Sequence, residues 1–320
     1  MTDTIKNTIL TNMKQKYNKI FWQVGQEITP ETFIQADRYI CSQQNLIHRL
    51  IARQYYGLFP QTASVTPSLY IKASLDNKDV YIEELVCEGI TRSGYLIEFD
   101  KNIISSVKNK RLSIPESNQK AYYIVLRVNP FEEVLIEPVE NEETPLSQPV
   151  YELDIRELEQ IREDELSILK IAMNGHSPQI ESDYIPPCMS VNSCSVLLEN
   201  HTQIKQVLAG IQSHIIQKKA LYSDSVYPIS FLLFELNEFP LSDPPVSLIR
   251  LIQKIIRTLN FFIPEISNIC EPDLLTGYNH NDITGIFRSC IIYLQEVQAV
   301  VSKEEKKVVV VEEEDFTPKI

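Results

Sequence analysis

The hydrophobic period of the chain changes near residue 190, and this change limits the folds that the chain can adopt. Before this point, short runs of β-branched and aromatic residues alternate with turn-forming pairs such as Asp76-Asn77 and Ser93-Gly94. After it, apolar residues recur every three or four positions, as on one face of a helix. We therefore expect a multidomain α+β protein in which a strand region precedes a helical region.

The strand region is expected to contain many short strands. The candidate strands are the runs 69–71, 80–82, 95–99, 122–128 and 134–136. The segment 166–173 leads into Asn174-Gly175, a strong hairpin turn, and the returning strand is expected over 180–184. Residues 137–149 hold three prolines and four glutamates, which predicts a solvated loop. Strands at this spacing predict a β-sandwich or a barrel.

One helix is expected ahead of these strands. Thr29 is a suitable N-cap residue, Pro30 suits the first helical position, and Gly57 lies just past the expected end. The apolar residues that recur on one face are Phe33, Ala36, Ile40, Ile47, Leu50 and Ile51.

Four helices are expected after residue 190, and together they predict a four-helix bundle. Three apolar stripes span 197–215, 248–262 and 283–301, and a shorter apolar segment spans 229–239. The stripe in the third of these helices covers more than one face, so we expect its second face to pack against another copy of the chain. The residues assigned to that contact are Ile249, Ile252, Ile256 and Leu259. The alternative is a central helix in one larger domain.

Charge and composition exclude several classes of function. A net charge of −13 over 320 residues disfavours nucleic acid as a partner, because phosphate binding needs clustered Lys and Arg. No apolar run reaches 18 residues, so no membrane insertion is expected. Six widely spread cysteines and an N-terminus without a secretory signal favour reduced thiols in the cytoplasm.

Glycine is scarce, with eight in the chain, and this argues against a phosphate-binding loop. Gly89 and Gly94 have the separation of a P-loop, but Tyr95 and Leu96 follow where Lys and Ser or Thr are needed. We therefore expect no nucleotide and no other cofactor.

The cysteines near residue 190 do not predict a metal site. Cys188 and Cys194 precede His201 and His214, but both spacings are longer than those of structural zinc sites. Buried thiols and a polar core position explain these residues more simply.

A second cluster, Tyr278, His280 and Asp282, precedes the last helix. A histidine two residues from an aspartate can act as a base with its orienting group. An N-cap at Asn281 or Asp282, with His280 bonded to nearby backbone, accounts for the same residues. We therefore expect no catalytic site and no enzyme. The alternative from another class is a small-molecule hydrolase with an unrecognised site in the strand region.

Four motifs occur in an order that resembles one protein family. They comprise Trp22 and Gly25, followed by Pro30, Phe33, Asp37, Arg38 and Tyr39; the segment 84–100 with Gly89 and Gly94 as turn residues; Tyr184, Pro186 and Pro187; and Tyr278, His280, Asp282 and Phe287. The first resembles the W-x-x-G, P-x-H-F-Q and Q-x-D-R-Y runs that open TssK, the type VI secretion baseplate subunit, although Thr32 replaces the histidine. The third and fourth resemble its Y-I-P-P and Y-x-H-x-D patterns.

The resemblance implies a non-enzymatic baseplate subunit that forms a homotrimer. It implies a β-sandwich shoulder over 21–187, like that of phage receptor-binding proteins, and a four-helix bundle neck over 188–303. The shoulder would hold TssF- and TssG-like wedge proteins. The far end would face the membrane-anchored complex at the cytoplasmic side of the inner membrane. A phage-like tail or receptor-binding adaptor is the alternative.

The two ends of the chain depart from the family pattern. Residues 1–20 are expected to form an N-terminal arm and 304–320 a charged tail with gatekeeper residues around Val308–Val311. The family carries a C-terminal head domain that docks on TssL and TssM, which this sequence does not continue into. We therefore expect another route to the membrane complex, with 308–320 as a candidate docking peptide.

Overall fold

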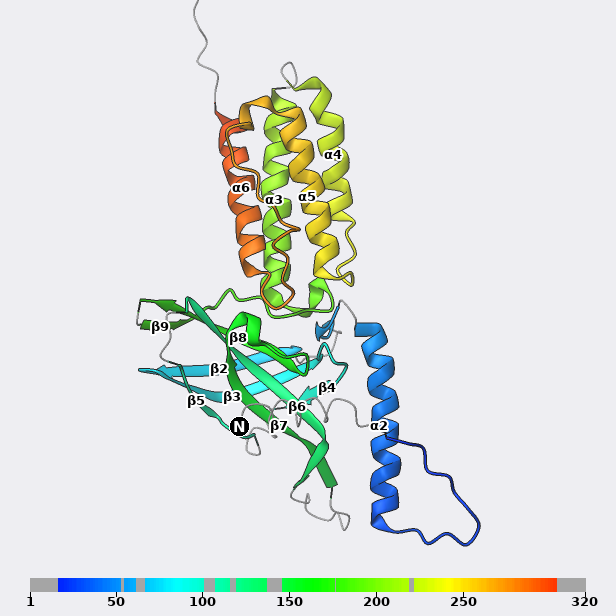
Figure 1. Cartoon of the computed structure of the whole chain (residues 1–320). Coiled ribbons are helices and arrows are strands. Elements are labelled where there is room, and N and C mark those ends of the chain that lie inside the picture. Colours follow the sequence, from blue (N-terminus) through cyan, green and yellow to red (C-terminus); the bar gives the residue numbers. More distant parts are fainter. Residues whose placement is uncertain are drawn as a thin grey trace, which may run out of the picture.

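The computed structural model describes residues 17–52, 55–61, 67–100, 107–115, 119–136, 146–175, 177–218 and 222–303. The expected α+β class is confirmed: two antiparallel sheets form one part of the molecule and four helices stand on them (Figure 1). A further helix, α2 (Pro30–Ala52), lies beside the sheets.

The first sheet is arranged around its longest strand, β3 (Asp79–Ile90). The other members are β1 (Gly57–Leu58), β2 (Leu69–Asp76), β4 (Leu96–Phe99) and β5 (Arg111–Ser113), and each pairs with β3 in antiparallel register. Alternate β3 side chains are buried on each side of a register shift at Glu83, with Val80 and Ile82 before it and Leu85 and Cys87 after it.

The second sheet has the order β7-β6-β8-β9. Its strands are β6 (Ala121–Ile136), β7 (Leu146–Arg156), β8 (Glu165–Asn174) and β9 (Ser177–Ile180). The two sheets share a core, in which Phe99 packs edge-to-face on Tyr151 with ring centroids 5.0 Å apart. The hairpin at Asn174-Gly175 is confirmed, and Gly175 takes the left-handed φ of +64° that such a turn requires. Its returning strand spans 177–180, earlier than expected.

The expectation of two strands at 122–128 and 134–136 is wrong, because both runs belong to β6. The register against β7 shifts between Asn129 and Glu133, so the chain passes the intervening residues as a bulge. Pro130 fits there because a bulge residue need not donate a ladder hydrogen bond. Part of the expected loop is also strand, since β7 begins at Leu146; residues 137–145 lie outside the described residues.

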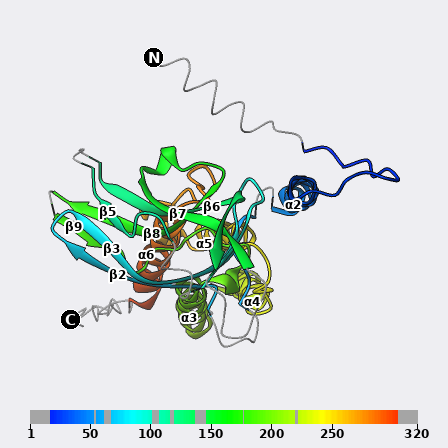
Figure 2. The same cartoon turned by 90° about the horizontal axis from the view of Figure 1, so that it is seen from below.

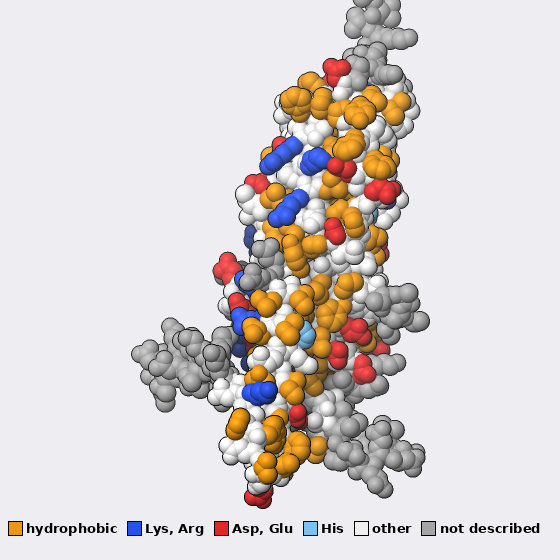
Figure 3. Space-filling view, turned by 90° about the vertical axis from the view of Figure 1, so that its right-hand side faces the viewer, with side chains coloured by type: hydrophobic (Ala, Val, Ile, Leu, Met, Phe, Trp, Pro, Cys, Tyr) orange, Lys and Arg blue, Asp and Glu red, His pale blue; other side chains and the backbone are white. Residues whose placement is uncertain are grey.

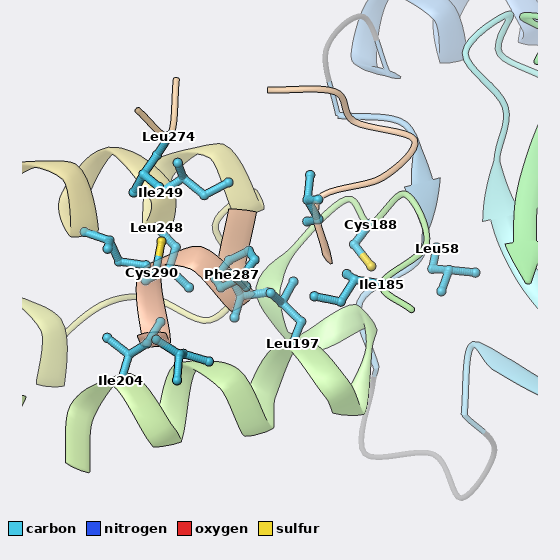
Figure 4. Packing of buried hydrophobic residues seen from close by; sticks show 14 of the residues in the cluster. Leu58, Ile185, Cys188, Leu197, Ile204, Leu248, Ile249, Leu274, Phe287 and Cys290 are labelled. Carbon is cyan, nitrogen blue, oxygen red and sulfur yellow. The ribbon is translucent and has the colours of Figure 1, made fainter. Parts of the chain in front are cut away.

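The helical region consists of α3 (Ser195–Gln217), α4 (Ser223–Asn237), α5 (Pro245–Phe262) and α6 (Thr284–Ser302). Short 3₁₀ turns occur at Leu158–Gln160, Val191–Ser193 and Pro264–Ile266. The helices run side by side, with α3 between α6 and α4 (Figure 1). Their inward stripes form a dry core where Leu197, Ile204 and Phe287 meet near Leu248 (Figure 4). Each of these side chains is fully buried, which contributes roughly 1.5–3 kcal/mol per residue.

Helix α2 begins as expected, with Thr29 as its N-cap. The Thr32 N–H donates to Thr29 Oγ1 at 3.4 Å, and the Thr29 N–H donates to Thr32 Oγ1 at 3.0 Å. Viewed along its axis, α2 stands at the margin of the sheets (Figure 2). Within the described ranges, no helix combines the length and apolar character needed to cross a bilayer.

Candidate functional site

The third and fourth sequence motifs meet where the helices rest on the strands, at a contact that we call the joint. Tyr184 belongs to the segment that leaves β9, and Asn281 belongs to the segment that enters α6. The Tyr184 hydroxyl donates to the Asn281 carbonyl at 2.7 Å and lies 2.9 Å from Ser167 Oγ on β8. Next to it, the Ile185 N–H donates to Thr284 Oγ1 at 2.9 Å. Segments almost 100 residues apart are thus bonded together.

A buried ionic cluster lies beside this contact. Lys170 Nζ on β8 lies 2.8 Å from Asp282 Oδ2 and 2.9 Å from Glu181 Oε2. The Tyr123 hydroxyl donates to the same Asp282 oxygen at 2.7 Å. Burial alone would lower the pKa of Lys170, but its hydrogen bonds to the two carboxylates outweigh burial and raise that pKa. The Lys170 ammonium therefore keeps its charge at neutral pH.

Arg288 extends the cluster along α6. Its guanidinium lies 2.8 Å from Glu181 Oε1 and 2.7 Å from Asp183 Oδ2. The hydrogen bond from Arg288 lowers the pKa of Asp183. Both acids belong to the segment after β9. Ion pairs therefore join the first turns of α6 to this segment, in addition to the hydrogen bond from the Ile185 N–H.

His280 is fixed by two hydrogen bonds that leave it neutral. Its Nε2 lies 2.6 Å from the Tyr56 carbonyl, which accepts, so Nε2 carries the proton. Its Nδ1 then accepts from the Tyr278 hydroxyl at 2.6 Å. Burial lowers the pKa of His280. The nearby Tyr56 hydroxyl donates to Asn281 Oδ1 at 2.8 Å, so the residues before β1 also join the network.

This geometry does not assemble the base and orienting group considered for His280 and Asp282. Both nitrogens of His280 are occupied, and Asp282 contacts Tyr123 and Lys170 instead. Asp282 Oδ1 accepts the Thr284 N–H at 3.1 Å. The expected N-cap at Asn281 or Asp282 is wrong, because Ile283 occupies the N-cap position of α6 and makes no side-chain cap. A cavity of about 350 Å³ lies on α5, but neither His280 nor Asp282 lines it. The joint is therefore built to hold two regions together.

Cys188 and Cys194, which were considered as metal ligands, follow the Tyr184 segment of the joint. Cys188 is buried, and burial raises the pKa of its thiol. A hydrogen bond from Cys188 lowers the pKa of Cys194 to about 7. His201 does not approach them: its ring contacts the Leu236 carbonyl at 3.4 Å and packs near Phe239. Among the described residues, no group of three or more His, Cys, Asp or Glu side chains could hold a metal ion.

The first two motifs lie away from the joint. Trp22 is half exposed, Gly25 forms a turn with a φ of +80°, and the remaining residues, Pro30, Phe33, Asp37, Arg38 and Tyr39, belong to α2. Gly94 is a turn residue with a φ of +87°, as expected. Gly89 is not a turn residue, because it lies inside β3, where its missing side chain lets the backbone of Gly57 approach.

The residues assigned to a subunit contact in the neck require a correction. Ile249, Ile252, Ile256 and Leu259 are fully buried within a single chain, so they cannot pack against another copy. They belong to the core of their own chain, where α5 packs against α4. The large apolar residues that do face outward in this region include Tyr227, Phe231, Phe234 and Phe261.

The sequence motifs located the joint but missed half of its members. Lys170, Glu181 and Arg288 carry most of the charge that bridges the two regions, and the neutral Tyr123 hydroxyl adds a hydrogen bond to Asp282. One signal was available, because Lys170 interrupts the apolar run 168–173 of β8 and such a lysine needs a partner of opposite charge.

No family model and no curated protein matches the chain. Solved structures share its fold. A crystal structure of TssK aligns over 91% of this chain and 71% of its own, with a TM-score of 0.60 and 13% identity. TssK in the cryo-electron microscopy structure of the type VI secretion TssK-TssF-TssG baseplate subcomplex aligns over 89% of this chain and 99% of its own, with a TM-score of 0.54 and 14% identity. The chain thus has the fold of TssK.

Proposed function

We propose that the chain is a non-enzymatic structural subunit of a type VI secretion baseplate. One observation carries this proposal: the TssK fold extends over both the strand region and the helical region, including the arrangement of one on the other. The fold is retained although the sequence identity is only 13%.

The proposed architecture is a β-sandwich shoulder over 21–187 and a four-helix bundle neck over 188–303, with an arm at 1–20 and a tail at 304–320. The shared core of the two sheets and the close packing of α3 to α6 support it. The joint makes the two parts one rigid body, because charged and neutral hydrogen bonds cross it in several places. A rigid body suits an adaptor that transmits position between two assemblies.

The proposed partners are wedge proteins like TssF and TssG, held by the shoulder, and further copies of the chain in a homotrimer. The baseplate structures that share this fold contain TssF and TssG beside TssK. The neck end would face the membrane-anchored complex at the cytoplasmic side of the inner membrane. The negative charge of the chain suits protein partners better than lipid headgroups.

Co-expression with the TssF- and TssG-like proteins of the same organism tests this function. We expect the tagged chain to retain both proteins through size-exclusion chromatography. A tagged chain that lacks residues 304–320 is the matched control, and it should retain them equally because the shoulder makes the contact. Failure of the full chain to retain either wedge protein would overturn the proposal.

A further inference from the structure

The cavity of about 350 Å³ on α5 lies apart from the joint, and we call it the α5 groove. Its lining includes three cations, which are Arg250, Lys254 and Arg257. Phe261 and Phe262 line it toward the C-terminal end of α5, and Leu275 forms part of its wall. Viewed from the right-hand side of Figure 1, Lys and Arg side chains gather over the helical region beside apolar side chains (Figure 3). In a chain of net charge −13, this gathering of cations suits the groove to an anionic ligand.

The groove holds more positive charge than its own carboxylates balance. Lys254 Nζ lies 2.7 Å from Glu235 Oε2, which neutralises it. Arg257 Nε lies 4.0 Å from Glu271 Oε1, a carboxylate that already accepts two amide hydrogen bonds. Among the residues that the structure describes, no carboxylate forms an ion pair with Arg250. Two arginines are therefore available to an acidic ligand.

The far end of the groove is apolar and exposed to solvent. Phe261 is 80% exposed, and its ring packs edge-to-face on Phe262 with centroids 4.9 Å apart. Leu275 is 39% exposed. A small inorganic anion would pair with the arginines but leave these apolar side chains in water. The groove therefore fits a ligand that carries apolar groups next to its acids, as an acidic peptide does.

Residues 308–316 of the same chain have this composition. They follow α6 in the sequence and lie outside the described residues. Residues 308–311 are four valines, residues 312–315 are four acids, and Phe316 comes next. Four β-branched apolar residues in a row favour aggregation unless a surface covers them. We propose that the α5 groove binds residues 308–316 of its own chain, with the valines on the phenylalanines and the acids on the cations.

The order of the two blocks matches the order of the groove. Helices α5 and α6 end at the same end of the helical region, and the 3₁₀ turn Pro264–Ile266 contacts both (Figure 1). A segment that continues from Lys303 therefore meets the phenylalanines first and the cations further along α5, and its valines precede its acids. Residues 304–311 can extend over about 27 Å, well beyond the roughly 10 Å between the axes of neighbouring helices.

The spacing of the charges also fits. Arg250, Lys254 and Arg257 occupy positions i, i+4 and i+7, so they share one side of α5 at steps of roughly 4.5–6 Å along its axis. In an extended segment, Glu312 and Glu314 project from the same side about 6.6 Å apart. The two carboxylates can therefore contact two cations of the groove at once.

Cleavage of the full-length chain by thermolysin, followed by mass spectrometry, tests this docking. Thermolysin cuts before apolar residues such as the four valines, and cleavage of a segment that releases and rebinds rapidly follows its free fraction. A tethered segment has an effective concentration on the order of 1 mM, so with a Kd of about 0.1 mM roughly one segment in ten is free. Arg250→Glu/Arg257→Glu should therefore raise the rate of cleavage within 308–311 about tenfold. Its circular dichroism spectrum should not change, because both side chains are exposed.

The matched control is Arg92→Glu/Lys108→Glu. It makes the same change in net charge at two side chains of the strand region that are 59% and 54% exposed. This variant should be cleaved at the wild-type rate, because only the position of the reversed charges differs. An equal acceleration in both double variants would show a general effect of charge and overturn the assignment to the groove.

Glu312→Lys/Glu314→Lys reads the same contact from the other side, without a change in the folded part. It should also be cleaved about tenfold faster. Combined with Arg250→Glu/Arg257→Glu, it exchanges the two charges and should restore slow cleavage. Equal rates in the wild type and either double variant, or no recovery in the combined variant, would overturn the proposal.

Co-expression of the chain with the reversed groove and the chain with the reversed segment identifies which groove is used. Neither chain then holds both partners, so both segments should be cleaved at the fast rate. Slow cleavage of the unaltered segment would show docking between copies and overturn the assignment to its own chain. The purified chain is tested without wedge proteins, so either result is independent of the proposed baseplate role.

Discussion

Lys170 and Asp282 form an ion pair of 2.8 Å across the joint, although 112 residues separate them in the chain. Lys170 belongs to β8 in the second sheet, and Asp282 lies just before α6, where its Oδ1 accepts the Thr284 N–H. Their side chains are only 15% and 12% exposed, so solvent screens the pair weakly. The attachment of the helices to the sheets therefore depends on a contact whose loss is costly.

Asp282→Asn should destabilise the chain by about 3 kcal/mol, because it leaves the buried charge of Lys170 with one carboxylate instead of two. The variant also weakens the hydrogen bond that Asp282 accepts from the Tyr123 hydroxyl. Urea denaturation followed by circular dichroism measures the change in the free energy of unfolding.

The control for this prediction is an exposed ion pair. Lys72 lies 2.8 Å from Glu83, but their side chains are 56% and 41% exposed. Lys72→Gln should therefore lower the free energy of unfolding far less than Asp282→Asn does. Equal losses for Asp282→Asn and Lys72→Gln would contradict the view that the joint is held by buried charge.

Stability should fall as the pH drops below about 6.5, because His280 is buried in its neutral form. Burial lowers its pKa in the folded state, so below the ordinary value of 6.5 the unfolded chain binds the proton more readily. The contribution of neutral His280 to the free energy of unfolding is fully present above pH 6.5. It is lost as the pH falls toward the pKa of His280 in the folded state, at up to about 1.4 kcal/mol per pH unit.

Thermal melting of the wild type and His280→Gln between pH 5 and about pH 8 checks this dependence. Glutamine can still donate to the Tyr56 carbonyl but does not titrate, so the slope of the melting temperature against pH should decrease. His201, whose pKa burial also lowers, should account for a second part of the slope, and His201→Gln is the matched comparison. An unchanged slope in His280→Gln would rule out this role for His280.

Much of the fold follows from local pattern. The N-cap at Thr29, the turn at Asn174-Gly175 and the stripes of α3, α5 and α6 each depend on neighbours within a few residues, which the sequence displays directly. Features that depend on contacts between residues far apart in the sequence are not predicted by local pattern. Helix α4 begins at Ser223, before its Pro228, because the proline removes a single hydrogen bond near the start of a helix that is held by buried neighbours on other elements.

The sequence indicates that α2 is amphipathic, but not which surface covers its apolar side. Periodicity specifies that Ile40 and Ile47 share a face. The structure shows that this face points outward, because Ile40 and Ile47 are 51% and 56% exposed. For the same reason the wide stripe of α5 suggested a subunit contact, although its residues pack within one chain.

Gly57→Ala should strongly destabilise the chain. Gly57 has a φ of +125°, and a Cβ there would lie 2.2 Å from the Pro187 carbonyl oxygen, which is backbone and cannot move aside. The crowded contact holds β1 against the segment leading to α3, where the Leu58 N–H donates to the same oxygen at 2.8 Å. Strain alone should cost about 1–3 kcal/mol, and the clash adds to it.

Gly285→Ala is the matched control for that substitution. Gly285 lies in the first turn of α6, its Cβ position is open, and alanine favours a helix by up to about 1 kcal/mol. Melting temperatures should therefore move in opposite directions. A Gly57→Ala variant as stable as the wild type would show that β1 does not need its close approach to Pro187.

Ile256→Asp and Phe261→Asp should separate folding from assembly on one helix. Both residues belong to α5, but Ile256 is fully buried and Phe261 is 80% exposed. An unpaired carboxylate at position 256 has no partner in the helical core, so the chain should lose at least about 3 kcal/mol and unfold in mild urea. At position 261 the carboxylate stays in water, and the unfolding midpoint should change little. Urea titration of both variants gives the result directly: a Phe261→Asp variant that loses as much stability as Ile256→Asp would show that folding itself requires the outer side of α5 to be covered.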